Sequence, residues 1–242
     1  MESLLLFDID GTLVDTGGAG MRALTSAMLE EFALHERAGD FPSLDLAGST
    51  DSGVVRLLFG HFEITLEPEN VERFYARYHI HLRRELSTWG RRHGRILPGV
   101  SQLIDRLHRD ENLSDRHALG LLTGNIARGA WTKVATYGLE GVFGFGAFGD
   151  DHHDRNELGP IAIERAALHT GKRFESNRVF IIGDTPKDIR CARACGAWAV
   201  AVATGKFNRP QLEEHEPDLL FDDFDDADHF VAEVERLMES EK

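Results

Sequence analysis

Cysteine is scarce in this sequence: Cys191 and Cys195 are the two cysteines among 242 residues, so a disulfide framework is excluded as the basis of the fold. They lie four residues apart in a segment of helical pattern. We expect small apolar packing there, with a redox pair as the alternative. Proline is also rare, at 7 residues, and 42% of the chain is hydrophobic, which argues against disordered and low-complexity proteins.

Basic residues are outnumbered, because 27 lysines and arginines face 41 acidic residues and leave a net charge of −14. This balance disfavours non-specific binding to nucleic acid or to anionic membranes. The longest apolar run, 197–203, has seven residues and is far short of the ~20 that cross a bilayer. The first residues lack a basic leader, so we expect a cytoplasmic protein without a membrane span.

Short apolar runs alternate with segments of helical periodicity. This order predicts an α/β fold with a parallel sheet, helices on both faces and the chemistry at the carboxyl ends of the strands. The predicted strands are 4–9, 118–122, 144–148, 179–182, 198–202 and 219–221. The helices predicted between and after these strands, beyond residue 92, are 99–110, 126–137, 158–170, 187–195, 209–214 and 225–239.

Residues 17–92 interrupt this alternation with three helical patterns and no convincing strand. We expect them to form a small helical domain inserted after the first strand, while residues 1–16 and 93–242 form the core. Glycines near both junctions, at 17–20 and 90–94, could act as hinges. The predicted helices of the insert are 19–34, 52–61 and 69–86.

Polar residues follow three of the predicted strands. Asp8 and Asp10 end the first, and Asp184 and Asp188 follow the strand at 179–182. The strand at 118–122 runs into Thr123, Gly124 and Asn125, where a hydroxyl and the free N–H groups of a helix start could bind a phosphate oxygen. Each residue alone could be a loop acid or a helix cap. Together they predict an acidic hole beside a phosphate site, and Mg²⁺ suits such oxygen ligands.

These segments resemble the haloacid dehalogenase superfamily, in the branch of phosphoglycolate phosphatase and beta-phosphoglucomutase. The stretch 8–13 matches its first motif, Thr123 the second and 183–188 the fourth. The resemblance implies a Rossmann-like three-layer core with a helical cap. It implies Asp8 as nucleophile, Asp10 as general acid/base and Thr123 on the phosphoryl oxygens. It also implies Mg²⁺ held by Asp8, the Asp10 carbonyl and Asp184, with Asp188 supporting the site.

The third motif departs from the family pattern. Relatives commonly carry a lysine followed by proline there, whereas this chain has no lysine in 154–160. We assign the role to Arg155, because a guanidinium can pair with carboxylates and phosphoryl oxygens. The alternative is a surface arginine among acids. In the insert, Gly48 to Asp51 resembles a loop that faces substrate in relatives, so Thr50 is a candidate substrate contact or else a helix cap.

The resemblance therefore implies a Mg²⁺-dependent phosphatase that hydrolyses a small phosphorylated metabolite through an aspartyl-phosphate, as a monomer or homodimer. A phosphosugar mutase of the same fold is the alternative, and a cap-mediated binding protein without turnover is a third interpretation. A dehalogenase is disfavoured, because Asp10 and an acidic metal site suit an anionic phosphate. The substrate itself is not encoded in any local motif.

Overall fold

Six apolar segments pair side by side in one sheet. In the structure, a computed structural model that describes residues 2–43 and 47–240, the strand order is β5-β4-β1-β6-β7-β8 and every pairing is parallel. β1 lies inside the sheet and is buried along its whole length, which explains its continuous apolar sequence. The strands are β1 (Ser3–Phe7), β4 (His117–Leu122), β5 (Gly146–Ala147), β6 (Val179–Gly183), β7 (Trp198–Val202) and β8 (Leu219–Phe221).

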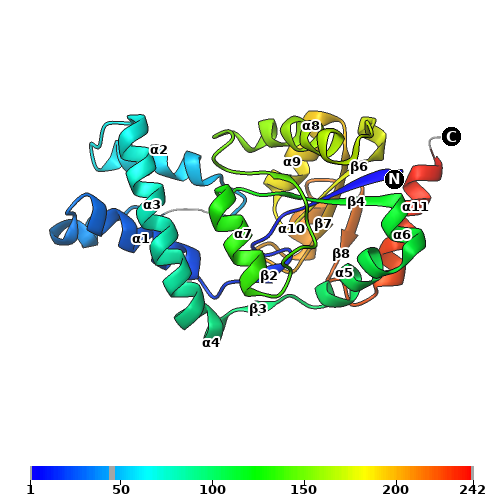
Figure 1. Cartoon of the computed structure of the whole chain (residues 1–242), viewed down its shortest axis with the longest axis horizontal. Coiled ribbons are helices and arrows are strands. Elements are labelled where there is room, and N and C mark those ends of the chain that lie inside the picture. The colour runs from blue at the N-terminus through cyan, green and yellow to red at the C-terminus, as the bar shows by residue number, and fades with distance from the viewer. Residues whose placement is uncertain (1, 44–46, 241–242) are drawn as a thin grey trace.

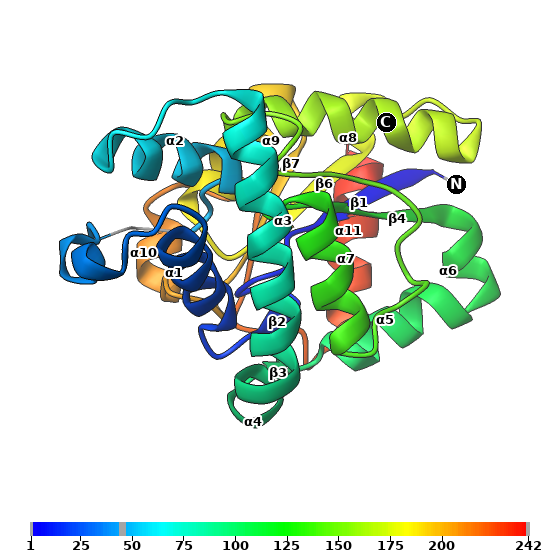
Figure 2. The same cartoon turned by 60° about the vertical axis from the view of Figure 1, so that its left-hand side comes forward.

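Helices cover both faces of this sheet, as Figures 1 and 2 show. Side chains alternate along β1, so Leu5 and Phe7 pack with α5, α7 and α11, while Leu4 and Leu6 pack with α8 and α9. The predicted three-layer α/β fold is therefore confirmed. The helices of these layers are α5 (Val100–Arg109), α6 (Glu111–Arg116), α7 (Ala127–Thr136), α8 (Leu158–Thr170), α9 (Pro186–Cys195), α10 (Arg209–Glu213) and α11 (Ala227–Ser240).

Three further helices, α1 (Ala19–Glu31), α2 (Asp51–His61) and α3 (Pro68–Glu85), lie beyond the carboxyl ends of the strands. We call α1–α3 the cap helices. Their buried side chains form a separate apolar cluster, to which Ile126 contributes from the loop after β4. The phenyl ring of Phe59 lies at its centre, edge-on to Phe32 at 5.2 Å and to Phe74 at 6.1 Å between ring centroids. The division into core and cap domains at these boundaries stays a prediction.

The chain leaves and re-enters the sheet through two adjacent strands. β2 (Val14–Asp15) and β3 (Arg95–Ile96) pair antiparallel, and Val14 lies opposite Ile96. The indole N–H of Trp89 donates to the carbonyl of Gly17 at 2.7 Å and so links the two connections. A π turn at Leu86–Gly90 and the short helix α4 (Arg91–His93) precede β3. Other parts of the chain form 3₁₀ turns at His35–Asp40, Arg155–Glu157 and Ser176–Arg178.

Several predicted boundaries differ from the structure: the strand expected at 4–9 ends at Phe7, and the helix expected at 19–34 ends at Glu31. The strand expected at 144–148 pairs only over β5, where glycines at 144 and 146 lack side chains that could support a longer strand. The helix expected at 99–110 ends at Arg109, because the Asp110 carboxylate accepts the N–H of Asn112 at 3.0 Å and starts α6 instead.

Across residues 2–43 and 47–240, every helix is too short or too polar to span a lipid bilayer.

The apolar cluster of the cap helices makes a stability prediction. Phe59→Ala removes a ring that is 1% exposed, and we expect the free energy of unfolding in urea to fall by about 3–5 kcal/mol. Leu57→Ala, on the same helix but 65% exposed, is the control and should change it by less than about 0.5 kcal/mol. Equal effects of the two substitutions would contradict the packing described here.

Candidate active site

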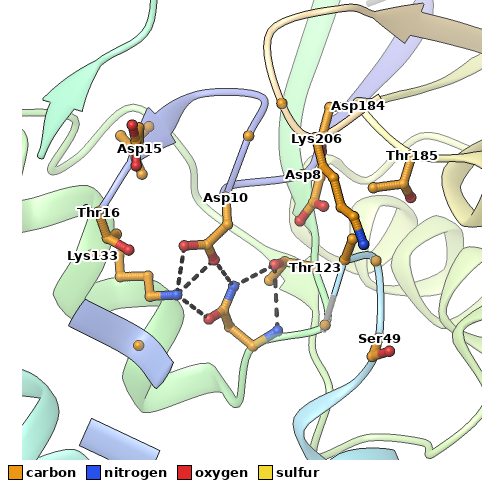
Figure 3. A pocket seen from close by; sticks show the side chains of 18 of the residues that line it. Asp8, Asp10, Asp15, Thr16, Ser49, Thr123, Lys133, Asp184, Thr185 and Lys206 are labelled. Carbon is orange, nitrogen blue, oxygen red and sulfur yellow. Dashed lines mark hydrogen bonds and ion pairs between the residues drawn. The ribbon is translucent and has the colours of Figure 1, made fainter. Parts of the chain in front are cut away.

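Polar side chains meet at the carboxyl end of the sheet. Asp8, Thr123 and Asp184 directly follow β1, β4 and β6, which are neighbours in the sheet. The registers of the two pairings end the three strands at nearly the same level. Figure 3 shows the three side chains around one pocket. The convergence expected from parallel strand order is therefore present.

Asp8, Asp184 and Asp188 form a buried carboxylate cluster. One oxygen from each lies within 4.8 Å of the others, and all three side chains are buried. Asp188 belongs to the first turn of α9, where its Oδ2 accepts the N–H of Thr185 at 3.0 Å and the Thr185 hydroxyl at 2.6 Å. Hard carboxylate oxygens at this separation are ligands that a divalent cation prefers.

Burial makes ionisation of this cluster costly. It raises the pKa of Asp8 to about 6, although the Arg155 guanidinium lowers it. The pKa of Asp184 is raised well above its ordinary value, first by burial and then by the charges of Asp188 and Asp8. A divalent cation between the three carboxylates would remove this cost, so the donor set fits the predicted Mg²⁺.

Arg155 is the cation beside the cluster. It lies in the 3₁₀ turn after β5, is 5% exposed, and places Nη2 3.0 Å from Asp8 Oδ2 and in contact with Asp188 Oδ1. Burial alone would lower its pKa, but the carboxylates of Asp188 and Asp8 outweigh burial and raise it. The arginine is thus not the surface residue that the alternative interpretation required. The role assigned to it from the third motif stays a prediction.

Asp10 points away from the carboxylate cluster. Its two oxygens lie 2.8 and 2.6 Å from the Lys133 ammonium, and Oδ2 also accepts the side-chain N–H of Asn125 at 2.8 Å. Asn125 donates in addition to the Thr123 hydroxyl oxygen at 2.8 Å. The side chain predicted to bind phosphate at position 125 is therefore engaged with Asp10, Lys133 and Thr123. The carbonyl of Asp10 as a metal ligand stays a prediction.

The N-terminus of α2 docks on the sheet domain at this site. The Asp51 N–H donates to the Gly124 carbonyl at 2.6 Å, and its carboxylate accepts the Ile126 N–H at 2.9 Å. The Ser52 hydroxyl contacts the carbonyl of Gly149. Burial raises the pKa of Asp51 to about 6. These contacts join the cap helices to the loops after β4 and β5.

Thr50 acts as a helix cap. Its hydroxyl donates to the carbonyl of His153 at 2.6 Å and accepts the N–H of Gly53 at 3.1 Å, and the residue is 2% exposed. Its two neighbours Ser49 and Asp51 line the pocket instead. The substrate contact predicted at position 50 has no support in this arrangement, because the hydroxyl is already used at the start of α2.

The pocket between the cap helices and the sheet has a volume of about 530 Å³. Gly124 forms part of its wall, and any side chain there would overlap the carbonyl of Ser49. Gly11, at φ +82°, similarly leaves room for the Asp184 carboxylate. Glycine at these two positions therefore permits the cap loop and the carboxylate cluster to approach the carboxyl end of the sheet.

Lys133 is a residue of this site that the sequence interpretation missed. It is 3% exposed and occupies the buried stripe of α7, together with Gly129, Ala130 and Val134. Lys133 lies three residues after Ala130 and one residue before Val134, and both of these are buried. A lysine within such an apolar helical pattern is the signal that could have identified it. Lysine is almost never fully buried unless it is paired.

Comparison with known proteins shows which proteins this chain resembles. A family model described as HAD-hydrolase-like matches residues 156–227, which include Asp184 and Asp188. A phosphoglycolate phosphatase from Nitrosococcus oceani is 23% identical over 231 residues, covering 96% of this chain and 97% of its own. The probable phosphatase IndB from Dickeya dadantii is 24% identical, covering 94% and 92%.

A solved structure has the same fold. The crystal structure of CbbY from Rhodobacter sphaeroides in complex with phosphate superposes with a TM-score of 0.69 at 18% identity, covering 93% of this chain and 96% of that one. The family model and the relatives confirm the predicted resemblance to haloacid dehalogenase-like hydrolases, and this structure confirms the fold.

The carboxylate cluster predicts how Mg²⁺ changes stability. In EDTA at neutral pH, Asp184→Asn should raise Tm, because the ionised Asp184 is destabilised by burial and by its two neighbours. Adding Mg²⁺ should raise the Tm of the wild type, since a ligand that binds only the folded state stabilises it, and should raise that of Asp184→Asn much less. A wild-type Tm that stays the same when millimolar Mg²⁺ is added would contradict the metal site.

Proposed function

We propose that this chain, a relative of the haloacid dehalogenase-like hydrolases, is a Mg²⁺-dependent phosphatase that acts on a small phosphorylated metabolite through an aspartyl-phosphate. The observation that carries the proposal is the position of Asp8. Its carboxylate follows β1, lies in a buried acidic cluster, contacts Arg155 at 3.0 Å and lines the pocket beneath the cap helices.

Asp8 has the properties of a positioned nucleophile. Its Oδ1 accepts the N–H of Ile9 at 2.7 Å, which fixes the carboxylate on a rigid strand end. The Thr123 hydroxyl donates to it and, with Arg155, favours its ionised form. These contacts support attack by an Asp8 oxygen on the phosphorus of a bound ester.

In the first step, the bond from phosphorus to the leaving oxygen breaks as the bond to Asp8 forms. The departing alkoxide takes a proton from Asp10, which lies on the loop two residues further along and must enter this step as the protonated acid. In the second step, water loses a proton to Asp10 and attacks the phosphorus, which releases phosphate and restores the Asp8 carboxylate. One acid/base group serves both steps because the second reverses the proton transfer of the first.

Asp8, Asp184 and Asp188 would hold Mg²⁺, with the Asp10 carbonyl as a further ligand. When bound, the cation offsets the repulsion between an anionic nucleophile and an anionic phosphate. The Arg155 guanidinium also lowers this repulsion, since it lies against both Asp8 and Asp188.

The cap helices and the loop before α2 form one side of the pocket, facing the reacting groups. Ser49, Asp51 and Tyr78 come from the cap side of the pocket, which otherwise would open to solvent. Exclusion of water protects the intermediate and completes the site. A volume near 530 Å³ accommodates a small metabolite.

Phosphate release is the direct test of this function. Purified protein with Mg²⁺ should release inorganic phosphate from at least one ester in a panel of phosphorylated metabolites, and EDTA should abolish the release until Mg²⁺ is restored. Free phosphate also distinguishes a phosphatase from a mutase, which would return the phosphoryl group to a sugar. Undiminished turnover in EDTA would refute the metal dependence.

Covalent trapping tests the role of Asp8. Rapid quenching during turnover, followed by borohydride reduction of the acyl phosphate, should modify Asp8 in a peptide map. Asp8→Asn, nearly identical in shape, should lose at least about 10³-fold in kcat because it lacks the attacking carboxylate. Its Tm measured in parallel shows that the variant is folded. Turnover by Asp8→Asn near the wild-type rate would demote Asp8 to a metal ligand.

A further inference from the structure

We propose that Lys133 is a positioning residue that fixes the general acid/base Asp10 beside the leaving group. The inference rests on the proposed function and adds a residue outside the matched motifs to it. Lys133 lies on α7, ten residues after Thr123, and its side chain reaches the loop that follows β1. Figure 3 shows its side chain pointing to Asp10, and its ammonium lies within hydrogen-bond distance of both Asp10 and Asn125.

The hydrogens of the Lys133 ammonium are fully used. Nζ lies 2.8 Å from Asp10 Oδ1, 2.6 Å from Asp10 Oδ2 and 2.6 Å from Asn125 Oδ1. An ammonium has three hydrogens, so these contacts leave none for a substrate. Lys133 therefore does not bind the phosphate directly, and any effect on the reaction passes through Asp10 and Asn125.

Burial makes this arrangement specific. The lysine is 3% exposed, whereas the Asp10 side chain is 40% exposed toward the pocket. A buried ammonium without a counter-charge is strongly destabilising, so this one retains its contact with Asp10. Lys133 on α7 thereby holds the Asp10 side chain at the pocket wall, while the exposed part of Asp10 stays accessible to substrate.

Asn125 extends the contact to the nucleophile. Its side-chain N–H group donates to both Asp10 and Thr123 at 2.8 Å, and Thr123 donates to Asp8. A single hydrogen-bonded series thus runs from Lys133 to Asp8. It fixes the separation between the group that attacks phosphorus and the group that protonates the leaving oxygen.

This role predicts a dependence on the leaving group. Protonation matters for an alkyl phosphate, whose alkoxide is a poor leaving group, and matters little for p-nitrophenyl phosphate, whose phenolate departs unaided. Lys133→Met should lower kcat/KM for a turned-over alkyl phosphate by about 10- to 100-fold more than kcat/KM for p-nitrophenyl phosphate. KM for both esters should change little, because the ammonium does not touch substrate.

Three further variants separate positioning from a merely structural role. Asp10→Asn should show the same selective loss, and Lys133→Met should add nothing in that background. Lys133→Arg, which keeps the charge, should recover part of the alkyl phosphate activity. Lys172→Met, at an exposed position after α8, is the matched control and should leave both activities unchanged. Should Lys133→Met fail to fold, the comparison of Lys133→Gln with Lys133→Arg replaces it.

Equal losses on the two esters, or an undiminished effect of Lys133→Met in the Asp10→Asn background, would overturn the role of Lys133 while leaving the proposed function intact. A wild type that hydrolyses neither ester with Mg²⁺ would refute the function. The contact is tested apart from activity by the ¹⁵N–¹H signal of the Lys133 ammonium, which should be visible in the wild type and lost in Asp10→Asn. A Lys133 ammonium signal that Asp10→Asn leaves unchanged would also overturn the role of Lys133.

Discussion

Buried negative charge at the end of the sheet is the constraint on which the rest of the site depends. Asp8, Asp184 and Asp188 approach one another within 4.8 Å in the interior, where each charge opposes the others. Arg155 compensates part of this charge through one nitrogen that contacts two of the carboxylates. The guanidinium also donates to the carbonyls of Leu122 and Gly48, both at 3.4 Å. The residue that balances the cluster thus also connects it to the sheet and to the cap loop.

That connection couples the chemistry to the cap helices. The loop at 47–50 contacts Arg155 from one side, and the start of α2 bonds to Gly124, Ile126 and Gly149 from the other. Ile126 packs among the cap side chains although it belongs to the loop after β4. Closure over the pocket therefore uses the same loop that carries Thr123. In lids of this kind, closure completes the site and excludes water.

Much of this arrangement follows from sequence because strand order places strand ends together. The parallel sheet, both helical layers and the meeting of Asp8, Thr123 and Asp184 are all consequences of alternating apolar runs. Contacts that depend on side chains far apart in sequence were not accessible in this way. Lys133 reaches Asp10 across 123 positions, and the hydroxyl of Thr50 finds the carbonyl of His153 across 103. Periodicity contains no information on such pairings. The sequence does place a lysine in the apolar stripe of α7, which indicates a buried charge but not its partner.

The two buried cations divide the site into separately compensated halves. Arg155 presents a planar group with several donors, which suits a position shared by two carboxylates, a sheet carbonyl and a loop carbonyl. Lys133 presents a compact ammonium, which suits a position between one carboxylate and one amide. Since the two cations pair with different carboxylates, a divalent ion entering the cluster of Asp8 would relieve repulsion there without displacing Lys133, the partner of Asp10. In the proposed mechanism, Asp8 as the attacking group and Asp10 as the proton-transferring group can then reach the same phosphorus while each is held by a different cation.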